Sequence, residues 1–155
     1  MMIIGEICYM ANVGDSRALI SKDGGKVVEP LSRDHKPTDE DEQIRICSNG
    51  GKIYQTQTIA NVQGMGNHYI LGPHRVFPGR LSVSRTFGDI EAKLEKYGGN
   101  PEVVVATPEI LEFKLTDDID FIVLGCDGIF DKLSNEETSE CVWKTVKDFK
   151  APNIH

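Results

Sequence analysis

The sequence feature that most constrains the fold is a short apolar run that ends in an Asp-Gly turn. Residues 121–125 read FIVLG, the length of a buried strand, and Asp127 and Gly128 follow at once. Glycine permits a turn that most residues resist. Asp131 lies four residues after Asp127, so one turn of helix would carry both carboxylates to the same side. Such hard oxygen donors suit Mg²⁺ or Mn²⁺, although an ordinary strand-turn-helix with solvated acids has the same local pattern.

Composition excludes several classes of function. The chain has 155 residues and 39% hydrophobic residues, which is enough for a globular core of single-domain size. A net charge of −7 without any Lys/Arg block argues against a nucleic-acid or anionic-membrane surface. Metal cations or basic peptides match this charge better.

The spacing of the cysteines and the lack of long apolar runs predict the cellular compartment of the protein. The four cysteines form no C-x-x-C pair, and the four histidines have no zinc-type spacing. We therefore expect idle thiols in a reducing compartment. The apolar start at residues 1–4 is too short for a signal peptide or a membrane span, and nothing longer follows. Cytosol or nucleus is the expected location, without a membrane partner.

The first third of the chain has the pattern of consecutive strands. Residues 3–12 and 16–21 are strand-like and meet at Gly14 and Asp15, which predicts a hairpin connection. Taken alone, Asp15 is most simply a turn residue that bonds its own backbone. A third strand over residues 26–31 would complete an antiparallel meander.

Helices are predicted at three places. Thr38 is a candidate N-cap, with acids at 39–42 in the first turn and glycines at 50–51 after the end. These acids are explained by the helix start without a metal site. A weak helix is predicted over residues 90–97. Ser134 and Glu137 form a capping box for a helix that runs to about residue 149.

The segments between these helices carry weaker signals. Residues 55–79 are rich in Gln, Asn and Gly, which predicts an irregular excursion around 52–79 with room for one hairpin. Arg85 and Asp89 are spaced to form an ion pair if their segment is helical. Residues 101–115 carry further strand signals. The order of strands and helices predicts an α+β domain with antiparallel sheets.

Five motifs in one order resemble the metal-dependent type 2C protein serine/threonine phosphatases. The motifs are residues 11–18 (ANVGDSRA), 31–37 (LSRDHKP) with E-x-x-R-I at 42–46 and Gly-Gly at 50–51, 81–89 (LSVSRTFGD), 101–103 (PEV) and 126–131 (CDGIFD). They extend over nearly the whole chain in the order of the family, so the match is strong where any one motif would be weak.

The resemblance implies both a fold and a reaction. The family has a sandwich of two antiparallel sheets flanked by helices, with a two-metal cleft at one edge. Its members hydrolyse phosphoserine and phosphothreonine esters of proteins, with water activated by Mg²⁺ or Mn²⁺. Phosphorylated proteins are thus the expected partners, and two or more metal ions per complete domain are the expected cofactors.

The resemblance also assigns roles to individual residues. Asp127 corresponds to a core metal ligand of the family. Asp15 and Asp131 match acids associated with a further, weaker metal in some members. The segment with Arg85 and Asp89 lines the neighbourhood of the cleft, without a ligand role. No residue of this chain corresponds to a catalytic group of the family.

Several family features are absent from this sequence. The family's N-terminal part supplies an Arg for phosphate, an acidic metal ligand and an Asp-Gly-His motif, and its closing Asp-Asn motif gives another core ligand. The stretch 52–76 is longer than the usual link and corresponds to the flap beside the cleft. We therefore expect a partial catalytic domain over residues 1–155, incomplete at both ends and inactive alone. Its metal affinity should be no tighter than about millimolar, and its exposed sheet edges would favour self-association.

Two other functions compete with this interpretation. A non-catalytic interaction domain could have kept the phosphatase fold and lost the site, because the missing ligands are explained equally well by such a loss or by truncation. An acidic Ca²⁺-binding module ranks last, since no stretch has the alternating Asp/Asn pattern of an EF-hand loop.

Overall fold

The computed structural model of this chain describes residues 1–62 and 66–149. The chain divides into two compact units. Residues 1–34 and the segment from 108 onward form unit 1, and residues 35–107 form unit 2. None of the helices in the described ranges has the length and apolar composition that a membrane crossing requires.

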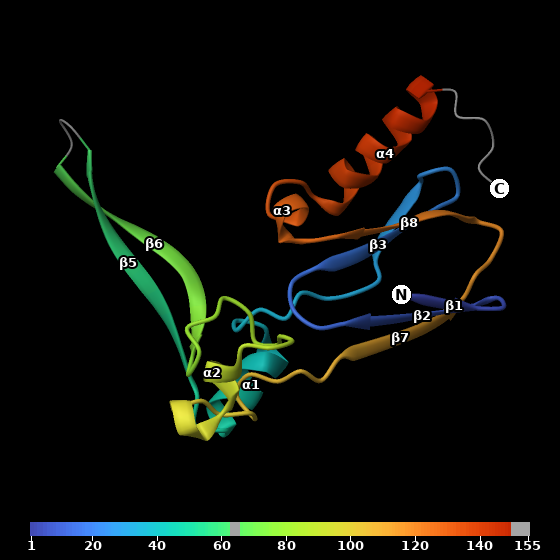
Figure 1. The fold of residues 1–155 in the computed structure, drawn as a ribbon. Helices are drawn as coiled ribbons and strands as arrows, with labels where there is room; N and C mark the ends of the chain where they lie inside the picture. Colours follow the sequence, from blue (N-terminus) through green and yellow to red (C-terminus); the bar gives the residue numbers. More distant parts are fainter. Residues whose placement is uncertain (63–65, 150–155) are drawn as a thin grey trace. The chain divides into compact units, whose positions relative to one another are not determined.

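Unit 1 contains two antiparallel sheets, each with three strands in the described residues, and helix α4 (Figure 1). One sheet has the order β1 (Met2–Ile4), β2 (Ile7–Asn12) and β7 (Glu109–Lys114). The other has the order β4 (Val27–Pro30), β3 (Arg17–Lys22) and β8 (Ile119–Gly125). The helices of the unit are the short α3 (Asp127–Phe130) and the longer α4 (Asn135–Phe149). The predicted α+β fold with an antiparallel β-sandwich and flanking helices is confirmed.

The predicted hairpin between residues 3–12 and 16–21 is wrong. A turn at Gly5, whose φ is +58°, splits the first run into β1 and β2. β2 then pairs with β1 and β7, whereas β3 pairs with β4 and β8. The segment around Asp15 therefore passes from one sheet to the other. The sequence of β3 explains this choice, because Ala18 to Ser21 are all buried and only a central strand covered on both faces can bury such a run.

Helix α4 lies against the outer face of the β4-β3-β8 sheet. The Trp143 ring packs on Phe121 of β8 with 5.6 Å between centroids, and its indole N–H donates to Oγ of Ser21 on β3 at 3.2 Å. The predicted capping box is confirmed. Ser134 and Glu137 each donate a backbone N–H to the other's side chain, at 2.8 and 3.1 Å.

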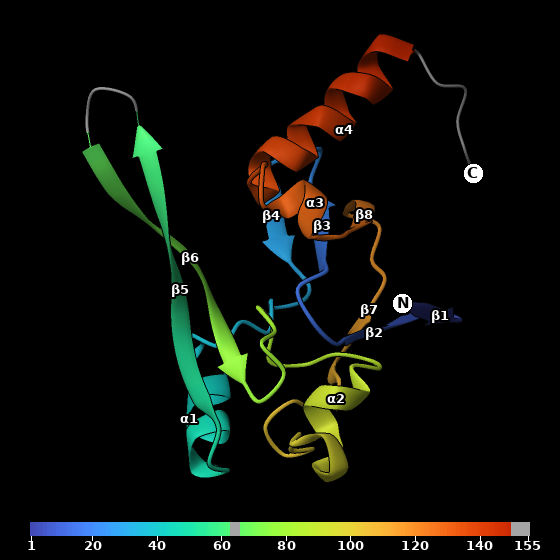
Figure 2. The same cartoon turned by 60° about the vertical axis from the view of Figure 1, so that its left-hand side comes forward.

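Unit 2 combines three short helical elements with a long hairpin (Figure 2). Its elements are α1 (Glu40–Ser48), β5 (Lys52–Val62), β6 (Gly66–Phe77), α2 (Ile90–Lys93) and the 3₁₀ helix η1 (Glu95–Tyr97). The apolar core consists of five buried residues, Ile46, Val76, Ala92, Val103 and Val104. Of the strand signals predicted over residues 101–115, only 109–114 form a strand, β7, whereas Val103 and Val104 enter this core from a turn.

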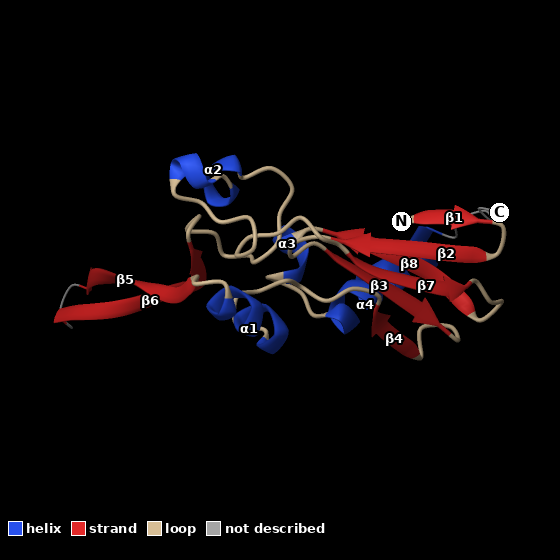
Figure 3. Cartoon of the chain, turned by 90° about the horizontal axis from the view of Figure 1, so that it is seen from below, coloured by secondary structure: helices blue, strands red, loops and turns tan. Residues whose placement is uncertain are grey.

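The excursion predicted at 52–79 is regular where irregular structure was expected, and it consists of the one hairpin that the sequence left room for. β5 and β6 pair along almost their whole described length, from Lys52 opposite Phe77 to Val62 opposite Gly66. The register shifts between Gln55 and Gln57. Figure 3 shows the two strands as a separate ribbon. The apolar alternation that marks a strand is weak here, and the apolar side chains Ile59, Tyr69, Ile70 and Leu71 are each more than half exposed. The regularity of the ribbon therefore comes from its backbone hydrogen bonds.

The turn between β3 and β4 provides a stability test with a matched control. Gly24 and Gly25 both have positive φ, +69° and +83°. A Cβ at Gly24 would meet nothing within 4 Å, whereas a Cβ at Gly25 would lie 2.5 Å from the indole nitrogen of Trp143. We predict that Gly24→Ala lowers the free energy of unfolding by about 1 kcal/mol, from backbone strain alone. Gly25→Ala should cost roughly 3 kcal/mol, because overpacking adds to the strain. Urea unfolding followed by Trp143 fluorescence measures both, and equal losses would contradict this packing.

Candidate functional site

The residues predicted to bind metal lie on segments that adjoin one end of the β3–β8 pair. These strands are antiparallel, and the last pair of the ladder joins Arg17, the first residue of β3, to Gly125, the last residue of β8. The segment that carries Asp15 therefore enters β3 at the edge where the chain leaves β8 toward Asp127. The sheet brings together two segments that are more than 100 residues apart in the sequence.

A tight corner links β8 to α3. A Cβ at Gly125 would lie 2.7 Å from the Phe130 ring, so a larger residue there would push the helix away from the strand end. Asp127 is the first residue of α3 and is exposed. The backbone N–H of Asp131 donates to the carbonyl of Asp127 at 2.8 Å, which continues the helical turn that the spacing of these two acids predicts.

Arg17 fixes this corner to its surroundings. Its Nε and Nη2 donate to the two carboxylate oxygens of Asp34 at 2.9 and 2.8 Å, and its Nη1 donates to Asn135 at 2.9 Å. The guanidinium also lies 4.8 Å from the centre of the Phe130 ring. The hydrogen bond with Asp34 raises the pKa of Arg17, and the charges of Asp34 and Asp131 add to this effect. The sequence places Arg17 in a motif but gives no signal for its partners, which lie on distant segments.

The three carboxylates do not complete a metal site by themselves. Their oxygens are the donors that Mg²⁺ and Mn²⁺ prefer. Within residues 1–62 and 66–149, however, no group of three or more His, Cys, Asp or Glu side chains is arranged to hold a metal ion. The donor chemistry thus fits a divalent cation, but the number of donors does not. The assignment of Asp15, Asp127 and Asp131 as ligands stays a prediction.

Arg85 and Asp89 lie in unit 2 and do not form the predicted helical pair. Residues 81–89 contain no helix, and Asp89 precedes α2 in a left-handed conformation with φ of 49°. Arg85 instead donates from Nη2 to Glu42 at 2.6 Å and from Nη1 to the carbonyl of Thr107 at 3.0 Å. Spacing alone could not reveal this partner, because Glu42 lies on α1. The place of Arg85 and Asp89 beside a cleft stays a prediction.

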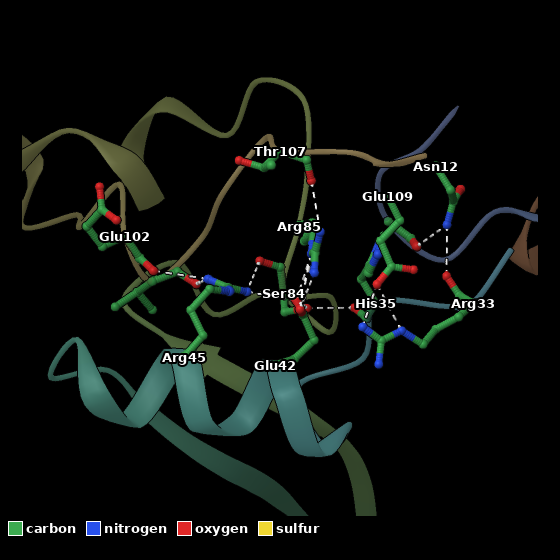
Figure 4. Close-up of polar contacts among 12 residues, drawn as sticks. Asn12, Arg33, His35, Glu42, Arg45, Ser84, Arg85, Glu102, Thr107 and Glu109 are labelled. Carbon is green, nitrogen blue, oxygen red and sulfur yellow. Dashed lines mark hydrogen bonds and ion pairs between the residues drawn. The ribbon is translucent and has the colours of Figure 1, made fainter. Parts of the chain in front are cut away.

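Glu42 is the centre of a buried network in unit 2 (Figure 4). Its side chain is 1% exposed and accepts hydrogen bonds from Arg85, from Arg45 at 2.7 Å and from the Ser84 hydroxyl. Arg45 also donates to the carbonyl of Val103 at 2.7 Å. Burial opposes the charge on Glu42, but the hydrogen bonds from Arg85, Ser84 and Arg45 outweigh it and lower the pKa from 4.5 to about 2. The network joins α1 to the 84–85 segment and to the core.

Comparison with known proteins identifies one family. The family model described as "Protein phosphatase 2C" matches residues 1–154. Protein phosphatase 2C homolog 3 of Schizosaccharomyces pombe is 34% identical over 143 residues, which are 92% of this chain and 30% of that protein. Probable protein phosphatase 2C 69 of Arabidopsis thaliana is 41% identical over 147 residues, which are 95% of this chain and 34% of that protein. The chain spans about a third of the length of the curated relatives it matches.

Solved structures agree with the fold. A crystal structure of a phosphatase from a pathogenic strain of Toxoplasma gondii matches with a TM-score of 0.66 and 27% identity, over 94% of this chain and 39% of that one. The structure of a Caenorhabditis elegans sex-determining protein matches with a TM-score of 0.67 over 96% of this chain and 29% of that one. Its identity of 23% makes it a likeness of fold alone.

The Glu42 network predicts a pH-dependent stability. Because the pKa of Glu42 is lowered by folding, the network stabilises the chain fully above pH 4.5 and loses this contribution as the pH falls through about 2. A lowering of this size corresponds to roughly 3 kcal/mol at pH 7. We predict that Glu42→Gln lowers the free energy of unfolding by about that amount at pH 7, and that the difference from the unmodified chain shrinks toward pH 2.

Glu40→Gln is the matched control for this measurement. Glu40 lies on the same helix but is exposed, so its substitution should change the free energy of unfolding by only about 0.5 kcal/mol. Urea unfolding followed by circular dichroism at a series of pH values compares the three proteins. A loss in Glu42→Gln that is equally large at pH 2 and pH 7 would contradict the role of the Glu42 charge.

Proposed function

Because the chain belongs to the protein phosphatase 2C family, we propose that it is part of an enzyme that hydrolyses phosphoserine and phosphothreonine esters of proteins with Mg²⁺ or Mn²⁺. The observation that carries this proposal is the β3–β8 ladder, which delivers the segments of Asp15 and Asp127 to one sheet edge. A shared edge is what residues from distant segments need if they are to serve one phosphoryl-transfer site.

The roles proposed for the residues follow from their placement. Asp127 is exposed at the first residue of α3 and is the ligand we assign to the core metal position. Asp15 and Asp131 are assigned to a further, weaker position. A bound divalent cation supplies an activated water and neutralises phosphoryl oxygens. The residues of this chain contribute carboxylate oxygens from segments at one end of β3 and β8, where the bidentate Arg17–Asp34 pair also lies.

We further propose that the chain alone is inactive. Its described residues offer no group of three metal-holding side chains, so a cation would be bound no tighter than about millimolar. The lack of such a group also fits a non-catalytic interaction domain, and activity of the whole protein distinguishes the two. All four cysteines are free thiols, which supports the cytosol or nucleus as the place of action.

Hydrolysis of phosphopeptides tests this proposal. The full-length protein should release phosphate in the presence of Mn²⁺ and lose this activity when a chelator is added. The rate of phosphate release should fall at least about a hundredfold in Asp127→Asn, since one charged ligand is lost. Asp117→Asn is the matched control, because Asp117 is an exposed acid in the turn that precedes β8 at its other end. It should leave the rate unchanged.

Two results would contradict the proposal. If the full-length protein is active and a chelator does not lower its rate of hydrolysis, the reaction does not require a metal ion. Chelator-sensitive hydrolysis by the pure 155-residue chain would show that it assembles a sufficient ligand set on its own.

A further inference from the structure

The base of the β5–β6 hairpin has one buried face and one open face. Ile53 and Val76 are opposite each other in the ladder, and both contact the apolar core of unit 2. Side chains alternate along a strand, so the neighbours of these two residues project to the other side. Those neighbours form the pairs Lys52 with Phe77 and Tyr54 with Arg75. The open face therefore carries two cations and two aromatic rings in register.

The open face is hollowed into a groove of about 690 Å³. Six residues line it, Lys52, Tyr54, Thr56, Arg75, Phe77 and Arg80. Phe77 is 50% exposed although it lies next to buried Val76. Arg75 donates from Nη1 to the carbonyl of Arg80 at 2.7 Å, which ties its guanidinium to the turn after β6. The groove is thus built on a paired ladder, with the Arg75 guanidinium held in place.

The charge of this groove is opposite to that of the chain. The net charge of the protein is −7. Among the described residues, however, no ion pair involves Lys52, Arg75 or Arg80. Within residues 1–62 and 66–149, the three positive side chains beside two aromatic rings are therefore not neutralised by a direct ion pair. An unneutralised cluster of this kind attracts anionic groups.

We propose that this groove, lined by Lys52, Tyr54, Thr56, Arg75, Phe77 and Arg80, binds an extended acidic peptide segment of a partner protein. Arginine binds carboxylates through paired hydrogen bonds, and aromatic faces accept apolar side chains. Side chains on one face of a strand repeat every ~6.5 Å, and an extended peptide has the same repeat. A segment in which Asp or Glu alternates with apolar residues can therefore match cations and rings together.

A peptide fits the groove better than a nucleic acid does. Proteins that bind single strands combine stacked aromatics with a basic track that follows many phosphates. The groove has three cations, so a long polyanion would leave most of its phosphates without a cationic partner there. A short segment with two or three carboxylates would not.

Fluorescence anisotropy of labelled probes tests the proposal on the 155-residue chain. The probes are a short peptide that alternates Glu with Leu and Phe, the same peptide with Gln for Glu, and a short oligothymidylate. We expect the acidic peptide to bind, and Lys52→Glu/Arg80→Glu to weaken it at least about tenfold. Lys26→Glu/Lys144→Glu is the control, since it makes the same charge change at exposed lysines of unit 1 and should bind normally.

A second measurement needs no variant. Amide NMR of the unmodified chain should show peptide-induced shifts at residues 52–56 and 75–80. Equal weakening in both double variants, equal affinity for the Gln peptide, preference for the oligothymidylate, shifts confined to other residues, or no binding of the acidic peptide would each overturn the proposal. The assays measure binding alone, so their result is independent of whether the whole protein hydrolyses phosphate esters.

Discussion

The antiparallel pairing of β3 with β8 is the interaction on which the rest of unit 1 depends. It joins segments about 100 residues apart and makes β3 a central strand, with Leu19 and Ile20 almost fully buried. The α4 helix is then held against the sheet through Trp143, which contacts Ser21 of β3 and Phe121 of β8. The same ladder decides where the chain turns into α3. The position of Asp127 is therefore a consequence of core packing in the sandwich.

In both units, ion pairs join segments that apolar packing alone does not hold together. In unit 1, the bidentate pair between Arg17 and Asp34 fixes the strand end beside α3. In unit 2, Glu42 is buried between Arg45 and Arg85, and a charge so buried is stable only because it is fully hydrogen-bonded. This network positions α1, on which the base of the β5–β6 hairpin packs. The basic groove on the hairpin's open face thus rests on a rigid support.

Local sequence signals predicted the elements whose causes are local. The strand over residues 121–125, the helical turn from Asp127 to Asp131 and the capping box at Ser134 all depend on neighbours in sequence, and the structure has each of them. The family and its fold were identified because five motifs keep one order. Pairing of distant segments was beyond such signals. The sequence suggested a hairpin at Asp15 because two strand-like runs are adjacent there, but the burial of β3 on both faces required partners from other parts of the chain. Glu42 was explained as helix-start chemistry, since nothing on α1 shows that Arg85 neutralises it.

A titration of Mn²⁺ into the 155-residue chain, followed by amide NMR, determines whether one sheet edge holds Asp15 and Asp127 together as part of an incomplete metal site. Paramagnetic broadening should then appear at residues 13–16 and 126–131 at the same Mn²⁺ concentration, with a midpoint no tighter than about millimolar. Asp127→Asn should abolish the broadening at both segments. Broadening that spares either segment, persists in Asp127→Asn, or saturates at micromolar Mn²⁺ would show that the two acids do not form one incomplete metal site.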